Sequence, residues 1–180
     1  MPEVTLSQLN QSLARVHWHP AGLVQRLDPP AALRPWLIDR GSLTHALRQN
    51  CPELVVQVLS EVYRRPNAQE ARTLNIPQTR LCWVRTIMMH CRGQPWVYAR
   101  TVIPNLTPGN PWYSLKQLGN QPLGEVLFNT PNLVRSDFRL AHLSALHPQW
   151  FARQSVFEPP HARAPLLLTE LFTLQPVGLK

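Results

Sequence analysis

Two arginines on a predicted β-hairpin, Arg85 and Arg100, are the side chains of this sequence that could together form an anion site. Residues 80–91 and 95–104 are both rich in strand-forming residue types. Arg92-Gly93 lies between them as a two-residue loop signal, because glycine readily supplies the positive φ that such a turn needs. Guanidinium groups bind carboxylates through paired, charge-assisted hydrogen bonds. We therefore expect this hairpin to carry a binding site for an acidic molecule.

The register of the hairpin decides whether the two arginines meet. If Cys91 pairs with Gln94 across the loop, Arg85 lies directly opposite Arg100 on one face of the sheet. A slip by one residue would place Thr101 opposite Arg85 instead. Like charges in directly opposed positions are destabilising. The predicted register, with the arginines face to face, therefore requires acidic side chains or an anionic ligand between them.

Glu170 is the acidic residue that could complete such a site. It lies in an otherwise apolar predicted strand, where period two places it on one face with Leu168 and Phe172. These neighbours favour burial, and a buried carboxylate needs a cationic partner because an unpaired buried charge is very costly. Two interpretations remain open. Glu170 either forms a structural ion pair with an arginine such as Arg85 or Arg100, or it binds a substrate hydroxyl or moves a proton.

Other familiar catalytic and metal-binding patterns are missing from the sequence. It contains no GxSxG elbow, Walker loop, dinucleotide fingerprint, HExxH or EF-hand loop. Its seven histidines do not recur with acids or cysteines at ligand spacing, so no metal site is predicted. The three cysteines, Cys51, Cys82 and Cys91, form an odd number without CxxC spacing. We therefore predict no disulfide framework, and we expect Cys82 and Cys91 to be small apolar strand residues.

Helices are predicted near the N-terminus and again after the hairpin. Ser7 can cap a segment with apolar residues at helical spacing, and Pro30 suits the first turn of a second helix. Ser42 is a suitable N-cap for a helix over Leu43–Gln49. Residues 115–128 are predicted to form short helices broken by glycine and proline.

Alternating apolar and polar residues predict strands through the rest of the chain, and residues 67–77 are predicted to form a loop. Short turns join most neighbouring strands, without the regular alternation of strand and helix that a parallel sheet needs. This pattern predicts an α+β domain with a single antiparallel sheet of about six strands. The predicted strands cover residues 54–63, 80–91, 95–104, 133–143, 150–157 and 166–174.

The composition is typical of one globular domain spanning residues 1–180, with 44% apolar and 16% charged residues. We find neither a signal-peptide layout nor an apolar run of about 20 residues, and therefore expect a cytoplasmic protein without membrane insertion. The net charge of +8 raises nucleic acid as a partner. However, the charge comes mostly from scattered arginines, and no nucleic-acid-binding motif is present. A basic enzyme that acts on a small molecule is the preferred interpretation.

Six blocks of the sequence resemble the chorismate pyruvate-lyase family. Each block is weak alone, but together they cover about ninety residues in the family's order. The N-terminal third matches only in its helical character and in the Ser42-Leu43-Thr44 segment. The blocks are VRTIMM at 84–89, GQPW at 93–96, ARTVIP at 99–104, LKQLG at 115–119, PLG at 122–124 and PLLLTELF at 165–172.

This resemblance implies a lyase that converts chorismate to 4-hydroxybenzoate and pyruvate, the entry to the ubiquinone ring, without a metal or an organic cofactor. It also implies an antiparallel sheet with helical flaps over a buried ligand site. Arg85 would bind the ring carboxylate, and Glu170 would lie near the ring hydroxyl. The backbone at Leu43 and Leu123 would contact the bound aromatic acid.

Chorismate carries two carboxylates, so two facing arginines suit it on chemical grounds as well. We assign Arg85 to the ring carboxylate and Arg100 to the enolpyruvyl side chain as a second catalytic residue. Glu170 would hydrogen-bond the ring hydroxyl and could serve as general base for the ring proton. An intramolecular hydrogen transfer to the enolpyruvyl methylene would need no base, and the two routes stay open.

A non-catalytic sensor or carrier domain for an aromatic acid is the alternative from another functional class. Related sheet folds serve as ligand sensors in bacterial transcription regulators, which is an argument from fold alone. Retention of Arg85, Arg100 and Glu170 together favours catalysis instead. We expect a monomer that binds chorismate and 4-hydroxybenzoate and does not bind nucleic acid.

Overall fold

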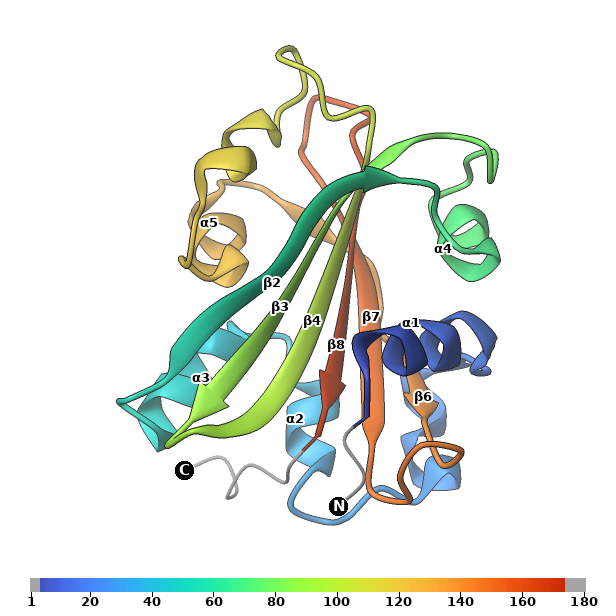
Figure 1. Cartoon of the computed structure of the whole chain (residues 1–180), viewed down its shortest axis with the longest axis vertical. Helices are drawn as coiled ribbons and strands as arrows, with labels where there is room; N and C mark the ends of the chain where they lie inside the picture. Colours follow the sequence, from blue (N-terminus) through green and yellow to red (C-terminus); the bar gives the residue numbers. More distant parts are fainter. Residues whose placement is uncertain (1–3, 174–180) are drawn as a thin grey trace.

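An antiparallel β-sheet forms the centre of the molecule (Figure 1), which the computed structural model describes over residues 4–173. Its strands follow the order β1-β6-β7-β8-β4-β3-β2, and β5 pairs with β7 beside this path. Every pairing is antiparallel. The strands are β1 (His19–Pro20), β2 (Val55–Arg64), β3 (Cys82–Cys91), β4 (Gln94–Pro104), β5 (Val134–Arg135), β6 (Arg139–His142), β7 (Phe151–Glu158) and β8 (Leu166–Phe172).

Helices cover both faces of this sheet. The α1/α4 face carries α1 and α4, and the α3/α5 face carries α2, α3 and α5 (Figure 1). The helices are α1 (Leu6–Arg15), α2 (Arg34–Ile38), α3 (Leu43–Asn50), α4 (Ala68–Thr73) and α5 (Leu123–Asn129), with 3₁₀ helices η1 (Ala21–Leu27) and η2 (Tyr113–Gln117).

The central strands have apolar residues on both faces because both faces are covered. Successive strand side chains point to opposite sides of a sheet. On β3, Trp83 and Ile87 therefore join the core of the α3/α5 face. Cys82 and Val84 join a cluster with Leu74 on the α1/α4 face. The charged residues Arg85, Arg100, Arg153 and Glu170 of the central strands are consequently buried, each on the face to which its position along the strand directs it.

The helix starts follow local capping signals. The Ser42 hydroxyl accepts a hydrogen bond from the His45 amide at 3.3 Å, as predicted for α3. In α1 the capping residue is Thr5 rather than the predicted Ser7, and it forms a reciprocal capping box with Gln8.

The predicted loop over residues 67–77 is wrong, because it contains α4. Asn67 caps this helix, and the side chain of Glu70 returns to the Asn67 amide at 2.9 Å. The signal was present in the sequence as a capping box, an N-cap residue followed three positions later by glutamate.

The α+β class and the single antiparallel sheet are confirmed, with eight strands rather than about six. The additional strands are β1 and β5, each of two residues. Strands of two residues are too short to show an alternation of apolar and polar residues. They form because a longer neighbouring strand offers backbone hydrogen-bond partners. The predicted last strand extended to Leu174, which lies outside the described residues.

The hairpin turn forms as predicted. Arg92 and Gly93 both have positive φ, 49° and 75°, as a two-residue turn between twisted antiparallel strands requires. Cys91 pairs with Gln94 across it.

The predicted face-to-face placement of Arg85 and Arg100 is nevertheless wrong. A β-bulge at Trp96 inserts one residue into β4 and shifts the register beyond it. Arg85 therefore pairs with Thr101, which is the one-residue slip considered above. Because side chains alternate between faces, the shift turns Arg100 to the α1/α4 face while Arg85 stays on the α3/α5 face.

The cysteine prediction is also corrected. Cys51 and Cys91 form a disulfide across 40 residues of sequence, whereas Cys82 is free and buried. Cys51 is the C-cap of α3, and Cys91 ends β3 at the hairpin turn. Sequence spacing did not reveal the bond because only the fold brings these two residues together. The disulfide fastens the end of α3 to the sheet.

We expect thiol counting to verify this bond. Protein unfolded without reductant should expose one thiol and, after reduction, three. Native protein should expose none, because Cys82 is buried and burial raises the pKa of its thiol to about 11. Cys51→Ser should lower the free energy of unfolding by about 2–4 kcal/mol, typical for a loop of this size. Three thiols in unreduced, unfolded protein would exclude the disulfide.

Candidate active site

A buried pocket lies between the sheet and the starts of α3 and α5. Its cavity volume is about 30 Å³, so the pocket is nearly filled by the side chains that line it. Arg85 from β3 and Glu170 from β8 both line it. Both side chains are almost fully buried, with exposed fractions of 2% for Arg85 and 5% for Glu170. The fold therefore brings together two of the three residues predicted to be catalytic.

Arg85 is held in place by the segment between η2 and α5. Its Nη2 donates to the carbonyl oxygens of Gly119 and Gln121 at 2.6 and 3.2 Å. Its Nη1 forms an ion pair with Glu61 on the neighbouring strand β2. The Arg85 Nε is buried and donates to no acceptor among residues 4–173. A buried unsatisfied donor on a charged group is costly, so this nitrogen is suited to a ligand oxygen.

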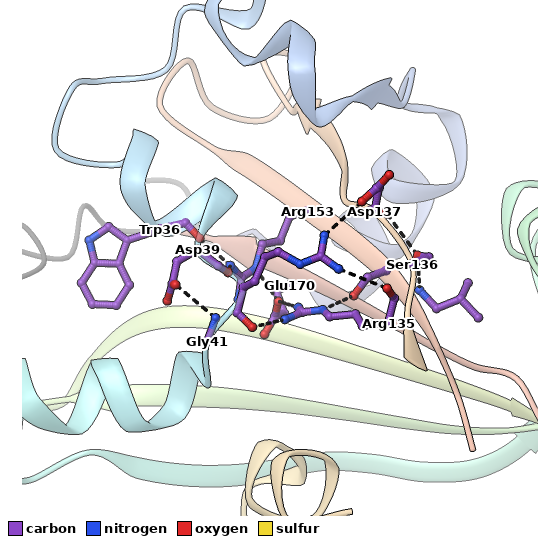
Figure 2. A network of polar contacts seen from close by, with 11 residues as sticks. Trp36, Asp39, Gly41, Arg135, Ser136, Asp137, Arg153 and Glu170 are labelled. Carbon is purple, nitrogen blue, oxygen red and sulfur yellow. Dashed lines mark hydrogen bonds and ion pairs between the residues drawn. The ribbon is translucent and has the colours of Figure 1, made fainter. Parts of the chain in front are cut away.

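Glu170 forms an ion pair with an arginine, as the first interpretation expected, but its partner is Arg153 rather than Arg85 or Arg100. The Nε of Arg153 donates to Glu170 Oε2 at 2.6 Å (Figure 2). Arg153 Nη1 also donates to the carbonyl oxygens of Trp36 and Asp39 at 2.6 and 2.9 Å. Arg153 is 1% exposed. It therefore joins the end of α2 to the carboxylate and fixes the orientation of Glu170.

Arg135 is the third arginine that lines the pocket. Its Nη2 lies 3.9 Å from Glu170 Oε2, beyond hydrogen-bond distance. Burial lowers the pKa of Arg135 to about 10, and the charge of Glu170 offsets this only in part. The guanidinium is nonetheless protonated at neutral pH. The walls of the pocket thus present three buried cations around one carboxylate.

Leu43 and Leu123 also line the pocket. They are the first residues of α3 and α5, where the backbone N–H groups have no partner within the helix. The two helix starts pack closely, since a Cβ on Gly124 would lie 3.2 Å from Thr44 Oγ1. An ion pair between Arg48 and Glu125 connects the two helices at the surface. The starts of both helices therefore lie at the same pocket.

Arg100 does not belong to this site. Its Nε and Nη2 donate to both carboxylate oxygens of Glu70 at 2.5 and 3.1 Å on the α1/α4 face. Burial lowers the pKa of Arg100, but its hydrogen bonds to Glu70 and the charge of that residue outweigh burial and raise it. A weaker contact at 3.4 Å reaches Asn10 on α1. The prediction that Arg100 shares a site with Arg85 is therefore wrong, and its interactions fasten α1 and α4 to the sheet.

We expect Arg100→Leu to destabilise the protein without removing its activity. The substitution leaves the Glu70 carboxylate buried and unpaired, which typically costs about 3–5 kcal/mol. Thermal unfolding should show this loss, and adding Glu70→Gln should recover part of it while preserving the α4 cap. Below the melting temperature, kcat/KM should stay close to the wild-type value. Loss of turnover in a fully folded Arg100→Leu variant would show that Arg100 takes part in catalysis.

Sequence reasoning missed Arg135 and Arg153. Both lie in segments predicted as strands. Arg153 lies on the same face of β7 as Phe151 and Phe157, which belong to the hydrophobic core. That is the same signal that selected Glu170, a charged residue at a core position of an apolar strand. Applied to cations as well as to carboxylates, it would have found Arg153.

The sequence comparison decides the family. The family described as chorismate lyase matches residues 12–177. The chain belongs to the chorismate lyase family. The assignment made from the six sequence blocks is confirmed, and with it the expectation of a lyase enzyme.

Named relatives agree over most of their length. A protein of Hydrogenovibrio crunogenus named "Probable chorismate pyruvate-lyase" is 48% identical over 87% of this chain and 89% of its own. The chorismate pyruvate-lyase of Erwinia tasmaniensis is 34% identical over 79% of this chain and 78% of its own.

Solved structures show the same fold in distant proteins. The C-terminal domain of PhnF is 14% identical, covers 69% of this chain and 84% of that domain, and has a TM-score of 0.53. The effector domain of PhnF from Mycobacterium smegmatis has a TM-score of 0.51 at 14% identity, covering 73% of this chain and 88% of that domain.

Among the helices of residues 4–173, none is long and apolar enough to cross a membrane.

Proposed function

We propose that this chain converts chorismate to 4-hydroxybenzoate and pyruvate, the entry to the ubiquinone ring. The observation that carries the proposal is one buried pocket, in a chorismate lyase family member, lined by both Arg85 and Glu170. These are the two side chains that the resemblance assigns to opposite ends of the aromatic acid. A pocket largely enclosed by the sheet and the starts of two helices suits a small acid and excludes a polymer.

Binding follows from the polar groups that line the pocket. The unpartnered Arg85 Nε receives the ring carboxylate, with the neighbouring backbone holding the guanidinium in place. Glu170 accepts a hydrogen bond from the ring hydroxyl through Oε1, which accepts no hydrogen bond from the described residues, while Oε2 stays with Arg153. The backbone at Leu43 and Leu123 contacts the acid from the helix starts.

The reaction breaks the bond between the ring carbon and the ether oxygen of the enolpyruvyl group. The ring carbon that bears the hydroxyl loses its hydrogen as a proton, and the released enolpyruvate takes up a proton to become pyruvate. The ring becomes aromatic, so orientation and charge stabilisation supply most of what catalysis needs. Glu170 is placed to accept the ring proton as general base, because its orientation is fixed by Arg153.

The test is to mix purified protein with chorismate and to follow the products by ultraviolet absorbance and chromatography. We expect 4-hydroxybenzoate and pyruvate in equal amounts without added metal or cofactor. Binding of 4-hydroxybenzoate without turnover would instead support the sensor or carrier. If chorismate is neither bound nor converted, the proposal fails.

We further propose that residues 1–180 act as one domain, as a monomer and in the cytoplasm, without binding nucleic acid. The single sheet with both faces covered by the chain's own helices supports the first two points. Size-exclusion chromatography with light scattering tests the monomer. Cell fractionation tests the compartment, and a cytoplasmic protein should carry Cys51 and Cys91 as free thiols until it is exposed to oxidising conditions.

A further inference from the structure

Arg135 is the pocket arginine that has no carboxylate of its own. Arg85 forms an ion pair with Glu61, and Arg153 is hydrogen-bonded to Glu170. In the described part of the chain, the one carboxylate within 4 Å of Arg135 is that same Glu170, 3.9 Å away and already engaged. Arg135 is therefore the cation of the pocket that remains when each carboxylate is assigned to one arginine.

The Arg135 side chain is nevertheless held in a defined position. Its Nε donates to Ser155 Oγ at 3.0 Å, and its Nη1 donates to the Arg40 carbonyl oxygen at 3.2 Å (Figure 2). Its guanidinium carbon lies 4.1 and 4.8 Å from the ring centroids of Phe138 and Phe157. The remaining nitrogen, Nη2, donates no hydrogen bond within residues 4–173 and is the one nearest Glu170.

Burying a cation that shares its counter-charge with another arginine is costly, and burial lowers the pKa of Arg135 although Glu170 offsets part of the effect. Binding of an anion beside such a cation in a ligand pocket is favourable, because the anion provides the missing counter-charge. A fixed guanidinium also needs little ordering on binding. The arrangement around Arg135 therefore fits a second acidic group of the substrate better than a structural role.

The chemistry of chorismate places its second carboxylate at this end of the pocket. Its hydroxyl and its enolpyruvyl ether are on adjacent ring carbons. If Glu170 receives the hydroxyl, the enolpyruvyl group lies beside Glu170, where Arg135 is. Arg85, at the ring carboxylate, would be too far around the ring to reach it.

We propose that Arg135 binds the carboxylate of the enolpyruvyl group and thereby makes the pocket specific for the dicarboxylate substrate over the monocarboxylate product. This inference rests on the proposed function. It gives Arg135 the role that the sequence analysis assigned to Arg100. When the ring–oxygen bond breaks, the electron pair goes to the ether oxygen, and the positive charge of Arg135 stabilises the leaving enolpyruvate. Arg153 stays bound to Glu170 and acts as a positioning residue.

The test compares two ligands that differ in this carboxylate. For Arg135→Gln we expect the KM for chorismate to rise by about ten- to a hundredfold, as for loss of a hydrogen bond between charged groups. The dissociation constant for 4-hydroxybenzoate, which lacks the second carboxylate, should change little. Arg135→Lys should recover part of the chorismate affinity by restoring the charge. Arg72→Gln, which removes an exposed arginine at the end of α4 on the other face of the sheet, is the control and should leave both ligands unaffected.

Stability separates this role from a structural one. Because Arg135 lacks a full ion pair, Arg135→Gln should keep or raise the melting temperature, whereas loss of a structural salt bridge would lower it. An unchanged KM for chorismate, or equal weakening of chorismate and 4-hydroxybenzoate, would overturn the inference. If the wild type binds both ligands and converts neither, the proposed function fails, while the effect of Arg135→Gln on the two affinities still decides the role of Arg135.

Discussion

Replacing Arg85 with alanine is expected to lower kcat/KM for chorismate by at least about a hundredfold, which corresponds to about 2.7 kcal/mol of lost transition-state stabilisation. The reason is loss of the buried guanidinium whose Nε faces the pocket without a partner. Affinity for 4-hydroxybenzoate should fall along with it, because the product retains the ring carboxylate. Steady-state kinetics and calorimetric titration of the product measure the two effects.

The control for this experiment is Glu61→Gln. Arg85→Ala also removes the partner of Glu61, but water can reach that partly exposed carboxylate on β2. Glu61→Gln breaks the same ion pair and keeps the cation, so it should retain most of the activity. If Glu61→Gln lowered turnover as much as Arg85→Ala, the ion pair rather than the free Nε would be the important feature.

Glu170→Gln is expected to lower kcat by at least about a hundredfold, within the usual contribution of a general base. The amide keeps the shape of the side chain and can still hydrogen-bond the ring hydroxyl, so binding of 4-hydroxybenzoate should be largely retained. The melting temperature should also fall, because Arg153 and Arg135 lose their shared negative charge. Kinetics below that temperature separate the chemical effect from the structural one.

A nearly full kcat in Glu170→Gln would exclude the base role and favour intramolecular hydrogen transfer to the enolpyruvyl methylene. Arg153→Lys is the companion variant. It retains a cation but lacks the flat guanidinium that donates to both Glu170 and the end of α2. If Arg153 positions Glu170, Arg153→Lys should reduce kcat more than it raises KM.

Much of the sheet could be predicted from the sequence because the signals are local. The hairpin turn at Arg92-Gly93, the alternation in its strands and the Ser42 cap each lie within a few residues. Glu170 was found for the same reason, as a charge inside an apolar strand. The family resemblance then pointed to Arg85 and to the helix starts at Leu43 and Leu123, which the structure places at one pocket.

The features that were missed depend on single-residue or long-range events. The bulge at Trp96 has no strong sequence signature, yet it moves Arg100 to the other face and changes its partner to Glu70. The Cys51–Cys91 bond requires the end of α3 to meet the hairpin. The cations of the pocket come from β5 and β7, so only the assembled sheet places Arg135 and Arg153 beside Glu170.

The location of the site is tested most directly by a crystal structure of the protein with 4-hydroxybenzoate. We expect the ligand between the sheet and the starts of α3 and α5, with its carboxylate at hydrogen-bond distance from Arg85 and its hydroxyl at Glu170. A ligand instead found on the other face, in the groove between α1 and β2 that Arg64 and Arg100 line, would contradict this account.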